Sequence, residues 1–588
     1  MHACICPKAY VALRLPSEQL KVIQILPNTT ISIGKYGSFQ ANLLLGRPYH
    51  LTFEILDKAE GEDYAALRIV PASELHGESL DNNDATPADA TESTIASEGD
   101  GVEYELVGEN GEVVMRTNRQ TIDDPSRQKM TMDEIEALKK EGTGAGKDLI
   151  AKLMLSHSGL DQKTSYSLAK YTLRKSRKYM RRFTVLPVDV PLLTRWLLNE
   201  REPMKVMELR EEMLSLVGSW ANIHYGGDNT TYPTDDGVGK ISGGRWLIVD
   251  ETGGLVVAAM AERMGILSPS DDEFDDRESN SADQQHSNPP QPESDGHEPC
   301  ATSQDASQTT HQQQHRRVLG MSAPTNSLTL IHANSQPNLS LLKYFLFDPS
   351  DPKPSHPLHT HLKTLSWLQL LSPEDDTGYA EPEVVPEEIL KTYKSGKRGT
   401  YFRKRRRWER IKNVIEETRA GGFDGLIVAS VMNPASILHT AVPLLRGGAP
   451  VVVYSPTVEP LAELADLYST ARRAAFVSDV PDSRDLPNED FPVNPTLLLG
   501  TTVQTARVRN WQVLPGRTHP MMTGKGGAEG YLFHALRVLP AEGKVEARGK
   551  FKRRKTAKEE DVSSKKEQST PVDGIGTPVG VKIETTDD

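Results

Sequence analysis

The sequence predicts two folded domains of different class, a small all-β domain and a larger α/β domain, joined by helices. Between residues 9 and 120, short β-branched and apolar runs alternate with Gly, Pro and Asn, which is typical of a small barrel or sandwich. Beyond residue 190, strands alternate with helices, a pattern that predicts a parallel sheet with crossover helices. Only 37% of the 588 residues are hydrophobic, so we expect much of the length to be solvated linker.

The first domain is expected to be β-barrel-like and to span residues 1–125. Its seven predicted strands read AYVALRLP, LKVIQILP, TTISIGKYG, YHLTFEIL, YAALRIV, VEYELV and EVVMRTN. An acidic insert at about residues 78–101 interrupts this pattern and offers almost no core-forming side chains. We expect this insert to be a disordered loop.

A basic, helical connector is expected over residues 126–190. Thr131 and Glu134 have the spacing of a capping box, which marks the start of its first helix. Its last predicted helix, residues 161–182, carries seven basic side chains on one broad stripe: Lys170, Arg174, Lys175, Arg177, Lys178, Arg181 and Arg182. These like charges repel one another, and no acid is interleaved after Asp161. We therefore favour a contact with RNA phosphates over a merely solvated helix face.

The α/β domain is expected over residues 191–543, with a disordered polar insert at 268–320 and a disordered tail at 544–588. It opens on RWLIVDETGGLVVAAMAERM, residues 245–264, a strand, glycine turn and helix of the kind that begins nucleotide-binding domains. Further strands are predicted at 327–334, 423–430, 449–456, 474–481, 508–520 and 530–540. The late strands indicate an antiparallel pair at the sheet edge, which is the usual shape of a Rossmann-like class I methyltransferase fold.

Three positions of such a fold test whether it still binds S-adenosylmethionine. A working site needs alternating glycines in the first turn, an acid after the second strand and a polar or acidic group after the fourth. Here the turn keeps only the adjacent pair Gly253 and Gly254, and strand 327–334 ends at Asn334 without a carboxylate. Strand 423–430 ends at Ser430, where an Asp is expected. We therefore predict a degenerate cofactor site that holds no cofactor.

A second basic cluster begins another predicted helix, residues 400–422. It consists of Arg403, Lys404, Arg405, Arg406 and Arg407, with Tyr401, Phe402 and Trp408 beside them. Basic residues interleaved with aromatic ones can hold single-stranded or splayed RNA. A nuclear import signal or a solvated helix start explains the same run equally well, and the sequence leaves these explanations open.

The composition and the C-terminal tail indicate the cellular compartment in which the protein is expected. Cys4, Cys6 and Cys300 form no zinc spacing and no disulfide framework, so a reducing compartment is expected. No apolar run approaches a membrane span or a signal core, and a soluble, intracellular protein without membrane contact is expected. The net charge of −13 still allows RNA binding, because acidic and basic residues cluster separately.

The tail run RGKFKRRKTAKEEDVSSKK favours nuclear localisation over a loose RNA tether, and Lys582 fits a short modifier-attachment pattern.

Four segments together resemble one family. They are SRQKMTMDEIEALKKEG, YSLAKYTLRKSRKYMRRFTVL, VDETGGLVVAAMAERMG and VRNWQVLPGRTHPMMTGKGGAEGYLFHALRV. All four are similar to the non-catalytic subunit of the eukaryotic tRNA (adenine-N1)-methyltransferase, which methylates the T-loop adenine, position 58. The resemblance covers most of the chain outside the acidic loop, the insert and the tail.

This resemblance implies a non-catalytic, tRNA-binding and structural role beside a catalytic subunit that binds S-adenosylmethionine. It also implies a heterotetramer of two heterodimers, in which both subunits contact tRNA. Phosphate contacts from basic side chains suit a protein that must bind many tRNAs by shape. Two alternatives stay open: an S-adenosylmethionine-dependent RNA methyltransferase active in its own right, and a translation-associated RNA-binding protein with a vestigial fold.

Two polar side chains, Arg517 and His519, attract attention as catalytic candidates, but we assign neither of them a catalytic role. Asp250 and Glu251 could remain from a cofactor loop and are expected to cap the following helix. Arg517 and His519 lie in the turn PGRTHPMMT, where a lone His is more often held by backbone partners. Because methionines make adaptable apolar contacts, we expect this turn to meet the partner subunit.

Overall fold

The computed structural model describes residues 4–57, 64–75, 106–107, 113–115, 129–141, 146–158, 165–224, 231–234, 237–240, 244–269, 326–376, 379–478, 486–514, 517–521 and 528–539. The acidic loop, nearly all of the 268–320 insert and the tail lie outside these ranges, so the predictions made for them remain predictions. The described residues up to 539 belong to one compact unit. All elements described below belong to this unit.

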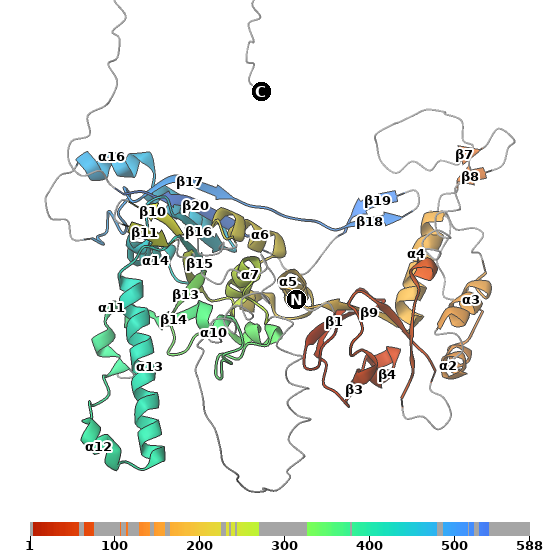
Figure 1. Cartoon of the computed structure of the whole chain (residues 1–588). Helices are drawn as coiled ribbons and strands as arrows, with labels where there is room; N and C mark the ends of the chain where they lie inside the picture. Colours follow the sequence, from red (N-terminus) through yellow and green to blue (C-terminus); the bar gives the residue numbers. More distant parts are fainter. Residues whose placement is uncertain are drawn as a thin grey trace, which may run out of the picture. The chain divides into compact units, whose positions relative to one another are not determined.

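A five-stranded antiparallel sheet of order β2-β1-β9-β5-β6 forms the first domain (Figure 1). Its strands are β1 (Tyr10–Arg14), β2 (Leu20–Gln24), β5 (Thr52–Ile55), β6 (Leu67–Ile69) and β9 (Arg182–Pro187). Short elements come from the same part of the sequence: β3 (Thr30–Ser32), η1 (Gly34–Tyr36), β4 (Ser38–Gln40), η2 (Ala41–Leu43) and the separate pair β7 (Leu106–Val107) and β8 (Val113–Met115). In the described ranges no pairing joins β2 to β6, so this sheet is open and the expected barrel is not observed.

The strand β9 corrects the predicted connector, residues 126–190. The helices there are α2 (Met132–Glu141), α3 (Lys147–Leu155) and α4 (Ser165–Tyr179), and the predicted capping box at the start of α2 is present. The sequence predicts a helix as far as residue 182, but α4 ends at Tyr179 and β9 pairs with β1 and β5. Phe183 and Val185 alternate along β9 and are fully buried. Burial of this alternating apolar face outweighs continuation of the helix.

A seven-stranded sheet of order β14-β13-β12-β15-β16-β20-β17 lies at the centre of the second domain. Its strands are β12 (Arg245–Asp250), β13 (Ser327–His332), β14 (Leu362–Ser366), β15 (Gly425–Ala429), β16 (Pro450–Ser455), β17 (Leu498–Gln504) and β20 (Tyr531–Arg537). Neighbours from β14 to β16 are parallel, whereas β20 is antiparallel to both β16 and β17. The predicted parallel sheet with a late antiparallel pair is thus observed, although one strand of the pair, β17, lies outside the predicted strand ranges.

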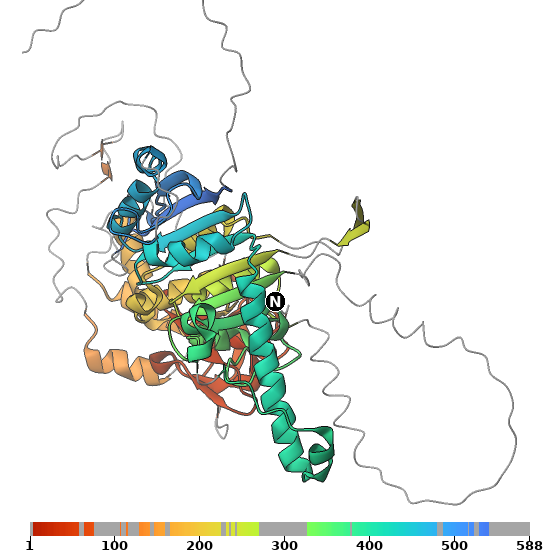
Figure 2. The same cartoon turned by 90° about the vertical axis from the view of Figure 1, so that its left-hand side faces the viewer.

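Helices cover both faces of this sheet (Figures 1 and 2). One face packs against α5 (Val190–Glu200), α6 (Glu211–Trp220) and α7 (Leu255–Met264). The other packs against α13 (Ser395–Arg419), α14 (Pro434–Ala441) and α15 (Glu459–Leu467). Trp246 and Ile248 of β12 belong to the first core, and Leu247 and Val249 to the second, as expected for a strand buried on both faces.

Shorter elements connect these layers. They are η5 (Pro203–Val206), β10 (Thr231–Thr234), β11 (Gly237–Lys240), η6 (Ser340–Phe345), α10 (Leu358–His361), α11 (Trp367–Leu371), η7 (Pro373–Asp375), α12 (Glu387–Thr392), η9 (Val442–Leu444), α16 (Thr470–Ser478), β18 (Trp511–Leu514) and β19 (Arg517–Pro520). None of the helices in the described ranges is long and apolar enough to span a membrane.

The structure corrects two predicted strands and adds to the seven-stranded sheet two strands, β14 and β17, that the sequence does not predict. Strand β14 was not among the predicted strands, because its sequence LKTLS is short and half polar. The strand expected at 474–481 is helix α16 up to Ser478, consistent with the good helix formers in ARRAA. The single strand expected at 508–520 is the two-stranded hairpin β18–β19, because the Pro515-Gly516 dipeptide is a turn signal that divides the run.

The first domain has a hydrophobic core of its own and also contacts a core of the second domain. Ala12 of β1 belongs to the same buried cluster as α5, α6 and α7. Tyr10 of β1 also meets Tyr344 of η6 edge-on, with ring centroids 5.0 Å apart. The first sheet therefore packs directly against the second domain through β1.

Candidate functional site

The glycine turn after β12 is covered by the chain itself. Gly253 and Gly254 adopt left-handed φ angles of 75° and 89°. A Cβ atom on Gly254 would lie 3.1 Å from Leu339 Cδ2, and one on Gly253 would lie 3.4 Å from Leu341 Cγ. The Leu341 amide also donates to the Gly253 carbonyl over 3.1 Å. Leucines that follow β13 thus lie against both glycines of this turn.

Asp250 caps α7, as predicted. Its Oδ1 accepts hydrogen bonds from Thr252 N (2.7 Å) and Thr252 Oγ1 (2.6 Å), and its Oδ2 accepts one from Val257 N (3.0 Å). Burial raises the pKa of the Asp250 carboxyl, and these hydrogen bonds oppose the shift. Amides at a helix N-terminus can bind an anion. Here that role is taken by a carboxylate of the preceding strand.

Glu251 does not cap α7, and this prediction was wrong. Its Oε2 accepts hydrogen bonds from Ser430 Oγ (2.9 Å) and Val431 N (2.8 Å), which join the ends of β12 and β15. At the end of β13, His332 Nδ1 donates to the Asn334 carbonyl over 2.7 Å, and burial lowers the His332 pKa. The polar groups at the ends of β13 and β15 therefore form hydrogen bonds within the protein. These internal hydrogen bonds support the predicted degenerate site.

The basic helix α4 exposes part of its predicted stripe. Its exposed members are Lys170, Arg174 and Lys178. Lys175 and Arg177 are half-buried, and Lys175 Nζ lies 4.9 Å from the centre of the Tyr171 ring. The Arg177 carbonyl accepts a hydrogen bond from Tyr36 Oη over 2.9 Å, which fixes α4 against the first domain. Three cations of the stripe are thus presented on an anchored helix.

Arg181 and Arg182 lie beyond the end of α4 and pair with acids. Arg182 is only 5% exposed, with Nε 3.0 Å from Glu54 Oε1 and Nη2 2.7 Å from Glu74 Oε1. Arg181 pairs with Asp57. The expected RNA contact by Arg182 is therefore wrong, because its guanidinium is buried in an internal charge cluster. A helical period cannot reveal this, since Arg182 is the first residue of β9.

Glu74 is the centre of that cluster. It pairs with Arg68 and Lys147 besides Arg182. Hydrogen bonds from Arg68 and Lys147 lower the Glu74 pKa to about 2, so the carboxylate stays charged. Because Lys147 begins α3, the cluster joins the connector helices to the first sheet.

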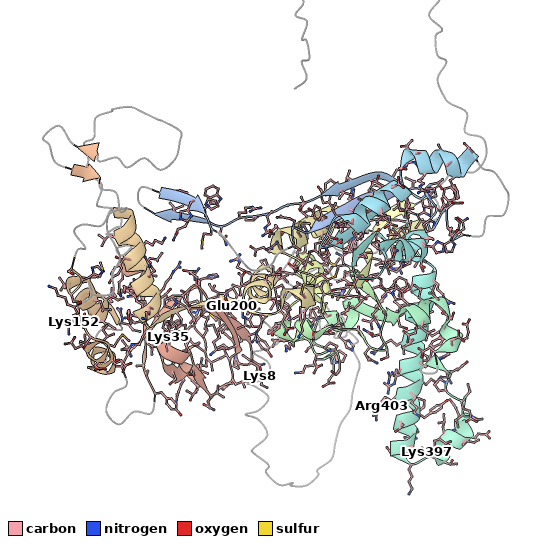
Figure 3. All side chains as sticks on the ribbon, turned by 180° about the vertical axis from the view of Figure 1, so that it is seen from behind. Lys8, Lys35, Lys152, Glu200, Lys397 and Arg403 are labelled. Carbon is pink, nitrogen blue, oxygen red and sulfur yellow. The ribbon has the colours of Figure 1, made fainter. Side chains whose placement is uncertain are left out.

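The second basic cluster lies on α13, a helix of 25 residues, and Figure 3 shows Arg403 and Lys397 toward its outer end. Four of the five predicted side chains are exposed and form no ion pair within the described ranges: Arg403, Lys404, Arg406 and Arg407. Arg405 Nε lies 3.1 Å from Glu409 Oε1, and Arg406 Nε donates to the Phe402 carbonyl over 3.4 Å. The run is therefore part of a long folded helix.

The aromatic residues of α13 have different surroundings. Tyr401 Oη accepts a hydrogen bond from Val385 N over 3.2 Å, and Trp408 stacks on Tyr379 with centroids 6.3 Å apart. Both rings thus pack α13 against the preceding segment. Phe402 is 42% exposed and remains accessible beside the basic side chains.

The hairpin β18–β19 presents apolar side chains to solvent. Trp511, Val513 and Met521 are 60%, 71% and 44% exposed. The base of the hairpin is held by Ala528, whose amide donates to Glu208 over 2.7 Å and whose carbonyl accepts from Arg507 over 3.0 Å. An anchored base and an apolar hairpin are the features of a docking element.

The catalytic candidates in this hairpin gain no support. His519 Nδ1 donates to the Pro520 carbonyl over 3.1 Å, and the side chain of Arg517 lies outside the described atoms, as does Met522. Within the described ranges no group of three or more His, Cys, Asp or Glu side chains could hold a metal ion.

Comparisons with known proteins show to which protein family the chain belongs. The model of the Gcd10p family matches residues 4–394. The curated tRNA (adenine(58)-N(1))-methyltransferase non-catalytic subunit trm6 of Aspergillus fumigatus is 50% identical over 612 aligned positions, which cover 100% of both chains. Proteins of the same name are 26% identical in Schizosaccharomyces pombe, over 94% of this chain and 96% of that one, and 25% identical in Mus musculus, over 72% and 74%.

Among solved structures, the tRNA (m1A58) methyltransferase TrmI of Aquifex aeolicus aligns over 91% of this chain and 100% of its own. Its sequence identity is 9% and its TM-score 0.35, a likeness too weak to bear on function. The family model and the full-length relative are decisive, because they cover most or all of the chain at high similarity. This chain belongs to the Gcd10p family.

Proposed function

We propose that this chain is the non-catalytic, tRNA-binding and structural subunit of a complex that methylates N1 of adenine 58 in the T-loop of tRNA. The curated relatives bear the name of that subunit. The observation that carries the proposal is the covered glycine turn, in which Leu339 and Leu341 lie against Gly254 and Gly253. A separate catalytic subunit then binds S-adenosylmethionine, and this chain binds no cofactor.

The tRNA contacts are assigned to two basic surfaces. On α4 they are Lys170, Arg174 and Lys178, and on α13 they are Arg403, Lys404 and Arg407. Cations on an exposed helix face bind phosphates without reading bases, which suits a subunit that serves many tRNAs. The exposed Phe402 adds a ring on which an unpaired base can stack.

The catalytic subunit is assigned to the hairpin β18–β19, in a heterotetramer of two heterodimers. An exposed Trp on an anchored hairpin is typical of an interface anchor, and the exposed Val513 extends the apolar surface beside it. Replacing Trp511 and Val513 by Ser should abolish co-purification of the two subunits. The matched control replaces Leu155 and Val384, which are 88% and 63% exposed elsewhere, and should leave the complex intact.

Nuclear localisation is proposed from the basic run at residues 548–566. This run lies outside the described residues, so the proposal depends on its composition. A reporter fused to residues 541–588 should accumulate in the nucleus and lose this distribution when the Lys and Arg of the run become Gln. Uniform distribution of the unaltered fusion would contradict the proposal.

Reconstitution of methyl transfer tests the proposed function. The chain, its catalytic subunit and both together are given tRNA and labelled S-adenosylmethionine, and methylation of the T-loop adenine is measured. Only the mixture should be active at a substantial rate. Methyl transfer by this chain alone would favour the alternative of a self-sufficient methyltransferase.

A further inference from the structure

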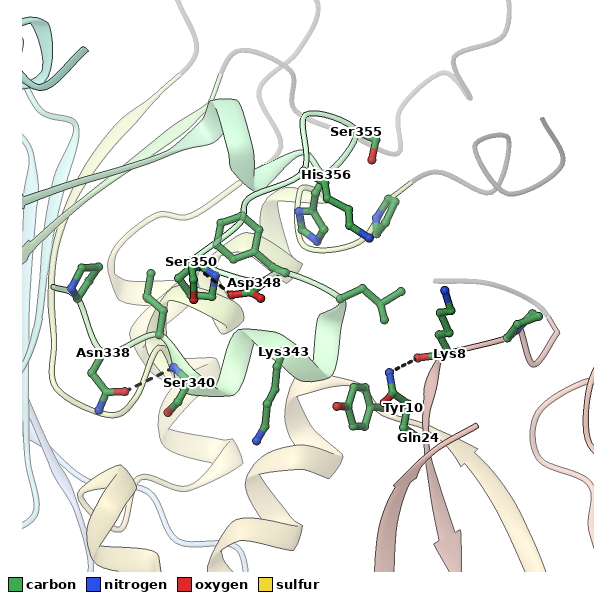
Figure 4. A pocket seen from close by; sticks show the side chains of 18 residues that line it. Lys8, Tyr10, Gln24, Asn338, Ser340, Lys343, Asp348, Ser350, Ser355 and His356 are labelled. Atoms are coloured by element: carbon green, nitrogen blue, oxygen red, sulfur yellow. Dashed lines mark hydrogen bonds between the residues drawn. The ribbon is translucent and has the colours of Figure 1, made fainter. Parts of the chain in front are cut away.

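A pocket of about 670 Å³ lies between the first domain and the segment that follows β13, apart from α4 and α13 (Figure 4). One wall comes from β1, β2 and the turn before β1, and the other from η6 and the loop after it. Its volume falls in the range of sites for small ligands. Apart from Leu339 at its edge, the residues that line this pocket have no role in the function proposed above.

The lining carries an excess of positive charge. Three lysines reach it from different elements: Lys8 before β1, Lys343 in η6 and Lys353 in the following loop. All three are exposed, and none forms an ion pair within the described ranges. One carboxylate also lines the pocket, that of Asp348, and its Oδ1 already accepts a hydrogen bond from Ser350 N over 2.9 Å. This balance favours an anionic ligand.

His356 adds no positive charge to the pocket. Its Nε2 donates to the Phe345 carbonyl over 3.0 Å, and its Nδ1 accepts from Leu358 N over 3.2 Å, so the ring is the neutral tautomer. Burial lowers the His356 pKa, which keeps the ring neutral. The imidazole therefore serves as a rigid wall.

Apolar rings and prolines form the remaining walls. Tyr10 is held by the edge-on contact with Tyr344, and Phe347 packs against His356 with centroids 5.1 Å apart. Rigid aromatic and apolar walls near cationic side chains suit a ligand that combines a flat ring with an anionic group.

The backbone is constrained on both sides of this pocket. Lys8 and Leu346 have positive φ angles of 66° and 65°, a conformation that side-chain-bearing residues rarely adopt. Lys8 is held there by its amide, which donates to Ile25 over 2.7 Å, and by its carbonyl, which accepts from Gln24 Nε2 over 3.0 Å. Such conformations cluster at binding sites, where the surrounding structure fixes them.

We propose that this pocket binds a nucleotide, with the phosphate among Lys8, Lys343 and Lys353 and the base between the apolar walls. The same chemistry is offered by a free mononucleotide and by an unpaired nucleotide within a bound RNA. The second source rests on the proposed function, whereas the first does not.

Calorimetric titration of the full chain with AMP, GMP, CMP and UMP tests the proposal. At least one of them should bind with one site per chain, and its nucleoside and inorganic phosphate should each bind at least about tenfold more weakly. Replacing Lys343 and Lys353 by Ala should weaken nucleotide binding by at least about tenfold. The matched control, Ala at the exposed Lys205 and Lys391, should leave it unchanged.

Competition with tRNA separates the two sources. If tRNA displaces the nucleotide, the site takes a nucleotide of the RNA, and if both bind together it takes a free one; either result supports the pocket. Absence of saturable binding by all four nucleotides, or binding unaffected by the double variant, overturns the proposal. Failure of tRNA binding with intact nucleotide binding would instead count against the proposed function.

Discussion

The three exposed cations of α4 should carry a measurable part of the salt dependence of tRNA binding. Lys170, Arg174 and Lys178 are exposed, whereas the other members of the predicted stripe are half-buried or paired. Each phosphate contact adds about 0.7–0.9 to the slope of log K against log salt, through release of counterions. Replacing all three by Ala should therefore lower the slope by about 2 to 3. At roughly 0.1 M salt, this corresponds to affinity that is weaker on the order of 10²-fold.

The assay is fluorescence anisotropy of labelled tRNA with the reconstituted complex, over roughly 50 to 300 mM salt. The control removes the same charge by changing Arg195, Lys205 and Arg446 to Ala, cations that pair with acids at other surfaces. Its slope should stay within experimental error of the unaltered complex. An unchanged slope in the α4 variant, or an equal loss in the control, would refute the assignment and leave α4 a solvated helix face.

Three further predictions concern stability, measured as the free energy of unfolding in urea. Burial, with a smaller contribution from Asp189, raises the Glu262 pKa to about 7, so its charged form destabilises the fold as pH rises from 4.5 through 7. Glu262→Gln can still accept the hydrogen bond from Val190 N and should gain about 3 kcal/mol at pH 8 but under about 1 kcal/mol at pH 5; equal gains at both would contradict this. Arg182→Met should cost about 1.5–3 kcal/mol, because Glu54 and Glu74 each lose a charged hydrogen-bond donor while Arg68 still pairs with both, and the salt slope of tRNA binding should stay unchanged; a flatter slope would show that Arg182 belongs to the RNA surface. Gly254→Ala should cost more than about 1 kcal/mol, since φ is 89° and the new Cβ would lie 3.2 Å from a backbone carbon; unchanged stability would show that the turn is not so tightly covered.

The parallel sheet was predictable because its central strands are continuous apolar runs. β12, β15 and β16 are buried on both faces, and such strands can be recognised without knowledge of their neighbours. By contrast, β14 and β9 were not recognised. Each is short and carries polar residues. Each forms a strand because it pairs with a neighbouring strand in the sheet.

The sequence predicts only those features of the candidate site that depend on which residue type stands at a given position. The lack of a carboxylate after β13 and of an Asp after β15 follows directly from the sequence. What covers the turn does not, because Leu339 and Leu341 lie beyond a long insert from Gly254 and meet it only in the fold. Exposure of individual cations on α4 likewise depends on what packs beside the helix.

Equilibrium titration with S-adenosylmethionine tests the central claim most directly. The full chain alone should show no saturable binding, whereas its complex with the catalytic subunit should bind one equivalent per heterodimer. Saturable binding of S-adenosylmethionine by this chain alone would contradict the account, because the space beside Gly253 and Gly254 would then have to admit a ligand.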